Sequence, residues 1–180
     1  MRIPAVALSL LVLAACGEAI APEPESLAAA AEHVSLLSGD YKPSSNTARA
    51  ITGGIVIQRG GAAFGNGVIL YTRTLNPRRG GDLIAKHGDS YAATVLGPAN
   101  LAVELRRVTE QVVPTGAIGL CGAATPQYVA LIHDERATTV TLLVFSGEEP
   151  PGPQAMQSRV CASFRYVAPE GARTREGVVL

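Results

Sequence analysis

Three histidines are the side chains best suited to proton transfer, and His133 is the most notable because Asp134 and Glu135 follow it. Such a group could place an acid beside a base, which is the arrangement of a hydrolase. Adjacent side chains on a tight turn point apart, however, and no Ser or Cys nucleophile is placed next to them. The motifs GxSxG, SxxK, HExxH, GxxxxGK and DxD are also missing. The sequence therefore predicts no enzyme, and catalysis by His133 stays open as an alternative.

Basic side chains gather around a glycine-rich segment near the middle of the chain. Four of them are candidate contacts for an anionic partner, namely Arg73, Arg78, Arg79 and Lys86. Arginine in particular binds carboxylates and phosphates in bidentate fashion. Arg106 and Arg107 extend this set if the fold brings them close, whereas a solvated loop is the alternative interpretation.

Composition excludes several functional classes. The 180 residues are 47% hydrophobic and 17% charged, and 15 basic side chains balance 15 acidic ones. This composition is that of a folded domain, not of a disordered chain. Zero net charge and few aromatic residues, with no Trp, disfavour nucleic-acid binding.

The N-terminus has the pattern of an export signal. One basic residue, Arg2, precedes an apolar run over residues 5–15 that is too short to cross a membrane as a helix. The run ends in Leu13-Ala14-Ala15-Cys16, which resembles the lipobox of bacterial lipoproteins. The resemblance implies cleavage before Cys16 and lipid attachment to that residue. Because Gly17 is not Asp, it also implies an outer-membrane protein that faces the periplasm; inner-membrane or secreted forms, or an ordinary signal peptide cut nearby, are the alternatives.

If Cys16 carries lipid, two cysteines are left for a compartment that oxidises thiols. Cys121 and Cys161 are therefore expected to form a disulfide. A metal site is not expected, because the two residues lie in no CxxC motif and no His lies within four residues of them. No cofactor is expected either.

The exported chain is expected to contain one domain. Residues 1–15 form the signal peptide, 16–47 a flexible tether with a short helix over 25–37, 48–168 a β domain and 169–180 a flexible tail. The cluster Ser38-Gly39-Asp40-Tyr41-Lys42-Pro43 breaks the chain before the domain begins.

Apolar residues follow a period of two after residue 51, which is typical of strands. The pattern predicts strands over 51–59, 68–75, 91–96, 101–108, 128–133, 139–145 and 160–167, in a barrel or sandwich of seven to eight antiparallel strands.

Three local features of these strands can be predicted. Leu101, Val103 and Leu105 should point inward, with Glu104 and Arg106 outward on a solvated face. The segments 128–132 and 140–145 are apolar on both faces and should pair as a central hairpin with 133–137 at its tip. Gly65-Asn66-Gly67 predicts a type I′ turn.

Several short motifs of the β domain resemble small exported proteins of proteobacteria that are known only as uncharacterised. They are Ile51-Thr52-Gly53, Phe64-Gly65-Asn66-Gly67, Leu120-Cys121-Gly122, Phe145-Ser146-Gly147 and Cys161-x-x-Phe164-x-Tyr166. The resemblance implies a secreted, disulfide-bonded β domain and no activity. Lipoprotein inhibitors of animal-type lysozymes are similar in architecture, but their Ser-Gly-x-x-Tyr motif is present only as Ser38-Gly39-Asp40-Tyr41, one residue short.

The sequence thus predicts an exported envelope lipoprotein that acts as a non-enzymatic binding or structural module. Its expected partners are the membrane, through lipid on Cys16, and another envelope protein or an anionic envelope polymer. One alternative is a lysozyme inhibitor whose protruding loop would be residues 148–154. The other is an envelope hydrolase that uses His133 with Asp134 or Glu135.

Overall fold

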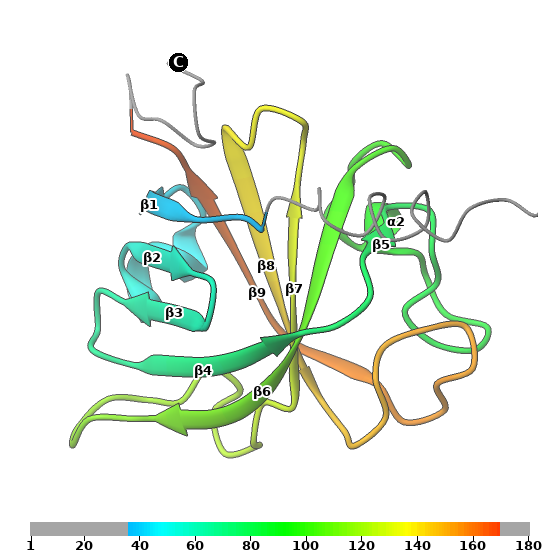
Figure 1. Ribbon diagram of the computed structural model, residues 1–180. Helices are drawn as coiled ribbons and strands as arrows, with labels where there is room; N and C mark the ends of the chain where they lie inside the picture. Colours follow the sequence, from blue (N-terminus) through cyan, green and yellow to red (C-terminus); the bar gives the residue numbers. More distant parts are fainter. Residues whose placement is uncertain (1–35, 170–180) are drawn as a thin grey trace, which may run out of the picture. The chain divides into compact units, whose positions relative to one another are not determined.

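Residues 36–169 are described by a computed structural model, and they form a closed antiparallel β-barrel of eight strands with one additional strand (Figure 1). In chain order the elements are β1 (Gly39–Pro43), the π-helical turn η1 (Ala48–Thr52), β2 (Ile55–Gln58), β3 (Gly61–Phe64), β4 (Ile69–Thr74), β5 (Arg78–Arg79), α2 (Tyr91–Val95), β6 (Ala102–Val112), β7 (Tyr128–His133), β8 (Thr139–Ser146) and β9 (Arg159–Val167). Each barrel strand pairs with its neighbour in the chain, and pairing of β1 with β9 and of β4 with β6 completes the circle. The short β5 pairs with the first residues of β6. None of the helices in this part of the chain has the length and apolarity that a membrane crossing requires.

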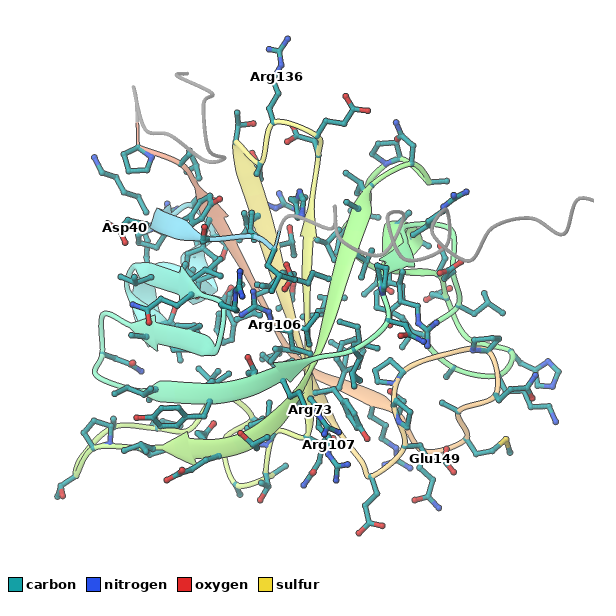
Figure 2. All side chains as sticks on the ribbon, viewed as in Figure 1. Asp40, Arg73, Arg106, Arg107, Arg136 and Glu149 are labelled. Carbon is teal, nitrogen blue, oxygen red and sulfur yellow. A yellow bond between two sulfur atoms is a disulfide. The ribbon has the colours of Figure 1, made fainter. Side chains whose placement is uncertain are left out.

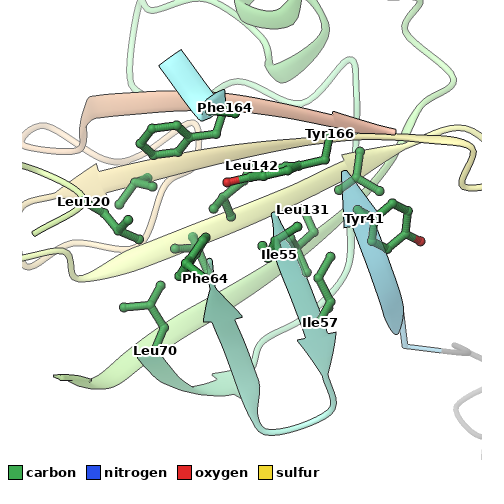
Figure 3. Close-up of a cluster of buried hydrophobic side chains, with 14 of the residues drawn as sticks. Tyr41, Ile55, Ile57, Phe64, Leu70, Leu120, Leu131, Leu142, Phe164 and Tyr166 are labelled. Atoms are coloured by element: carbon green, nitrogen blue, oxygen red, sulfur yellow. The ribbon is translucent and has the colours of Figure 1, made fainter. Parts of the chain in front are cut away.

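The barrel interior is filled by side chains. The residues that pack there come from all eight strands, and Figure 3 shows the largest of them, including Tyr41, Ile55, Phe64, Leu70, Leu131, Leu142, Phe164 and Tyr166. Eight strands enclose a space that side chains can just fill. The interior of the barrel is therefore a packed core.

A second apolar cluster lies on the outside of β6, β7 and β8. Val103 and Leu105 of β6 belong to it, together with Tyr91 of α2 and Phe145 of β8. The rings of Tyr91 and Phe145 meet edge to face, with 6.3 Å between their centroids. The segment between β4 and β6 thus covers this face of the barrel, so both faces of β7 and β8 are buried. The prediction of a central hairpin from strands covered on both sides is confirmed, with Tyr128 opposite Phe145 and His133 opposite Val140.

The predicted orientation of β6 is wrong. Glu104 and Arg106 are buried, and Arg106 has only 1% of its surface exposed. Figure 2 shows Arg106 inside the barrel. Val103 and Leu105 face outward instead, beneath the covering segment. The predicted alternation of apolar and polar residues is present in β6. Its apolar face is the outer one, because the second apolar cluster packs there.

The buried pair of Glu104 and Arg106 is hydrogen-bonded to the main chain of Leu37, just before strand β1. Arg106 Nε and Nη2 each lie 2.7 Å from Glu104 Oε1. The Leu37 N–H donates to Glu104 Oε2 at 2.8 Å, and Arg106 Nη2 donates to the Leu37 carbonyl oxygen at 3.2 Å. Arg106 Nη1 donates to the Gln58 carbonyl oxygen at 2.6 Å. Both charges are thus neutralised and hydrogen-bonded, as burial of charged groups requires.

The folded domain begins earlier than predicted. Gly39–Pro43 forms β1 and pairs with both β2 and β9, although the sequence placed it in the tether. Turn-forming Gly and Pro at the two ends of this strand obscured it. The predicted signal peptide, Cys16, the helix over 25–37 up to residue 35, and the tail from residue 170 lie outside the described residues.

Two further predictions of local structure are wrong. The segment over 91–96 contains helix α2, since Ser90 Oγ accepts from the Ala93 N–H at 3.1 Å and caps the helix at its start. The turn between β3 and β4 is not of type I′, which needs positive φ at both central residues; only Gly67, with φ of 86°, is left-handed there. The Gly67 N–H donates to the Phe64 carbonyl oxygen at 2.9 Å, and this closes the turn.

Strand β3 was not among the predicted strands, and it begins at Gly61. A Cβ atom at Gly61 would overlap the Leu70 carbonyl oxygen of the neighbouring strand. Glycine is therefore required by the close approach of β3 and β4 and does not mark a turn here.

Candidate functional site

Two exposed arginines lie directly opposite each other on the outside of the barrel. Arg73 of β4 is paired in register with Arg107 of β6. Figure 2 shows their side chains next to each other. Like charges directly opposite across two strands destabilise a sheet. A counter-charge beside the two guanidinium groups would relieve this repulsion.

Within residues 36–169, no acidic side chain forms an ion pair with either arginine. Within residues 36–169 the one ion pair is the buried one between Arg106 and Glu104, and neither Arg73 nor Arg107 forms a hydrogen bond with another side chain there. Glu110, on the outside of β6, lies opposite Tyr71 and not opposite an arginine. Tyr71 has 48% of its surface exposed beside the pair. The two guanidinium groups are thus available to an anion from outside, with an aromatic ring at the edge of the site.

The other predicted basic residues lie apart from this pair. Arg79 is opposite Ala102 in β6. Arg107 lies five positions beyond Ala102 on the same strand, which is about 17 Å. Lys86 is exposed on the covering segment, where its N–H donates to the Ala155 carbonyl oxygen at 2.9 Å. The fold therefore joins Arg107 to Arg73, as the sequence anticipated for an extended patch, while Arg106 is buried away from it.

Arg78 is partly covered by neighbouring residues of the segment between β4 and β6. It is half-buried near Tyr91, and its Nε atom is fully covered. Burial raises the pKa of Tyr91 to about 12, although the positive charge of Arg78 acts in the opposite direction. Among the four predicted contacts, Arg73 is thus the one that the fold combines with a second exposed arginine.

The side chain of His133 is hydrogen-bonded to the main chain at the end of β7. His133 is the last residue of β7 and is buried, so only residues 134–138 form the hairpin tip. Its Nδ1 atom donates to the Asp134 carbonyl oxygen at 2.7 Å. The Asp134 carboxylate instead accepts from the Thr138 N–H at 3.3 Å and from the Thr138 hydroxyl at 3.4 Å, and so it stabilises the turn. No hydrogen bond within the described residues joins the imidazole to the carboxylate of Asp134 or Glu135.

The loop proposed for a lysozyme-inhibitor function is hydrogen-bonded to the segment that covers the barrel. Gly152 is buried, and its N–H donates to the Ile84 carbonyl oxygen at 2.8 Å. The Glu149 carboxylate accepts from the main-chain N–H groups of Met156 and Gln157, at 2.6 and 3.2 Å. Residues 148–154 therefore fold back on the covering segment and do not protrude as a free loop.

The predicted cysteine pair is confirmed. The sulfur atoms of Cys121 and Cys161 lie at bonding distance, with 5.2 Å between the Cα atoms. The bond joins the long segment between β6 and β7 to the start of β9. Within residues 36–169, no group of three or more His, Cys, Asp and Glu side chains is arranged to hold a metal ion.

No protein-family model matches the chain, and neither does any curated protein or solved structure.

Proposed function

We propose that the chain is a lipid-anchored protein of the bacterial envelope that binds an anionic envelope component through the outer surface of its barrel, without catalysing a reaction. The resemblance of Leu13-Ala14-Ala15-Cys16 to a lipobox supports the anchor and an outer-membrane position facing the periplasm. The bonded pair Cys121–Cys161 is consistent with an oxidising compartment.

The observation that carries the binding role is the exposed pair Arg73 and Arg107. Two guanidinium groups on neighbouring strands present several N–H donors in one direction, and an oxyanion that bridges them would relieve their repulsion. Carboxylate and phosphate oxygens share the required chemistry. Both occur in the envelope, in peptidoglycan, in lipopolysaccharide and in phospholipid headgroups.

The packed interior supports the same proposal. Because side chains from all eight strands pack in the interior, recognition is expected on the outside of the barrel. Lipid on Cys16 would keep the protein at the membrane, where the outer surface of the barrel is close to other envelope components.

Binding to three defined anionic probes tests the proposal: lipopolysaccharide, vesicles that contain phosphatidylglycerol, and soluble peptidoglycan fragments. The unmodified protein should bind at least one of them, less tightly as salt increases. The double variant Arg73→Ala/Arg107→Ala should lose at least about tenfold in affinity, since it removes two charge-assisted contacts. The double variant Arg79→Ala/Lys86→Ala loses the same charge elsewhere and should bind almost normally.

Equal binding by the two double variants would show that only general charge matters and would remove this site. Failure of all three probes to bind the unmodified protein would remove the proposed anionic partner.

A further inference from the structure

An uncharged stretch of chain forms part of the surface at one end of the barrel. Residues 112–127, which include the connection from β6 to β7, contain no charged side chain. The two most exposed large apolar side chains at this end are Ile118, with 68% of its surface exposed, and Ile51 of η1, with 42%. Exposed apolar residues scattered singly need no explanation, but grouped ones mark interaction sites.

Two hollows flank these isoleucines. One has a volume of about 430 Å³ and includes Pro114 and Ala117, while the other has about 370 Å³ and includes Leu120 and Phe164. Ile51 and Ile118 line both hollows, and no charged residue lines either of them. By contrast, two hollows near the β7–β8 hairpin tip include Asp134, and one of them also includes Glu135 and Arg136. The two hollows beside the isoleucines thus differ from the two near the hairpin tip in having no charged residue in their lining.

Hydrogen bonds and the disulfide hold this surface in one shape. The Ala117 N–H donates to the Pro114 carbonyl oxygen at 3.0 Å, and the Gly122 N–H donates to that of Gly119 at 2.9 Å. The side chain of Leu120 is buried in the barrel core, and the neighbouring Cys121 is bonded to β9. A surface that is already ordered loses little conformational entropy when a partner binds.

We infer that Ile51, Ile118 and the two hollows beside them dock an uncharged, apolar polypeptide segment of another protein. The centres of protein interfaces are depleted of charged residues, as this surface is. The hollows also contain the hydroxyls of Thr115 and Ser163, which form no hydrogen bond with another described residue. A peptide main chain offers N–H and C=O groups to such hydroxyls, whereas an acyl chain would leave them without partners. This surface shares no residue with the Arg73 and Arg107 site, so it requires a second partner or a second region of the same one.

Selection from a random twelve-residue peptide library displayed on phage, against the purified full-length protein, tests the inference. The selected peptides should be rich in apolar residues and poor in charged ones. Each is then synthesised and measured against Ile118→Asp and Ile51→Asp, and both variants should bind at least about tenfold more weakly. Leu96→Asp is the matched control, because Leu96 is 93% exposed and lines neither hollow.

The variants must first unfold at the same urea concentration as the unmodified protein, which their exposed positions predict. The inference is overturned if no peptide is selected, if the selected peptides need charged residues, or if Ile118→Asp binds them normally. Two results would overturn the inferred polypeptide partner and assign this surface to another one. Binding to neutral phosphatidylcholine vesicles that Ile118→Asp abolishes would assign it to lipid, and a dimer that this substitution dissociates would assign it to a second copy of the chain. Normal peptide binding by Arg73→Ala/Arg107→Ala would keep this result separate from the anion-binding proposal.

Discussion

Replacing Arg106 with alanine should lower the free energy of unfolding by about 3–5 kcal/mol, the range for breaking a buried ion pair by removing one partner. The change leaves the Glu104 carboxylate buried without its counter-charge. It also removes the donors to the carbonyl oxygens of Leu37 and Gln58. Urea unfolding followed by circular dichroism measures the loss.

Arg107→Ala is the matched control, because Arg107 is the next residue on the same strand but is exposed on the outside. It should change stability by less than about 0.5 kcal/mol. The double variant Glu104→Leu/Arg106→Met should be more stable than Arg106→Ala, since it buries no unpaired charge. Equal stability of Arg106→Ala and Arg107→Ala would contradict the interior position of the pair.

Loss of the bond between Cys121 and Cys161 should have an effect of similar size. The bond joins residues 40 positions apart, and the chain-entropy relation for such a loop gives about 4 kcal/mol. The double variant Cys121→Ser/Cys161→Ser should therefore unfold at a markedly lower urea concentration. Reduction of the unmodified protein should have the same effect.

Cys16→Ser is the control for this prediction, because it removes the cysteine that precedes the barrel and leaves Cys121 and Cys161 unchanged. Its urea midpoint, measured after reduction, should equal that of the reduced unmodified protein. Without reduction it should equal that of the oxidised protein. If the double variant were as stable as the unmodified protein, the bond would contribute nothing to the barrel.

The parts of the fold that could be predicted from sequence are those that depend on local pattern. Strands β7 and β8 have apolar residues on both faces and a short polar turn between them, so their pairing follows from the chain itself. Helix α2 was predicted as a strand because Tyr91 and Val95 suit strands, whereas the Ser90 cap and two alanines decide for a helix. In β6 the alternation of apolar and polar residues is clear from the sequence. The buried position of Arg106, however, depends on the main-chain carbonyl oxygens of Leu37 and Gln58, which are far away in the sequence.

The candidate site shows the same limit. Arg73 was grouped with Arg78 and Arg79 because they are close in the chain, yet its neighbour in space is Arg107, 34 positions later. Only the closure of the barrel between β4 and β6 brings those two together. No local signal predicts that register, because it depends on the whole circle of strands and on the irregularity at Tyr71 and Thr72.

The measurement that tests the central claim most directly is the intact mass of the protein purified from native membranes, before and after reduction. We predict the mass of residues 16–180 plus attached lipid, with an increase of about two hydrogen masses on reduction of one disulfide. An unlipidated mass with three free thiols would contradict both the anchor and the cysteine bond. It would also remove the envelope position on which the proposed anionic partner depends.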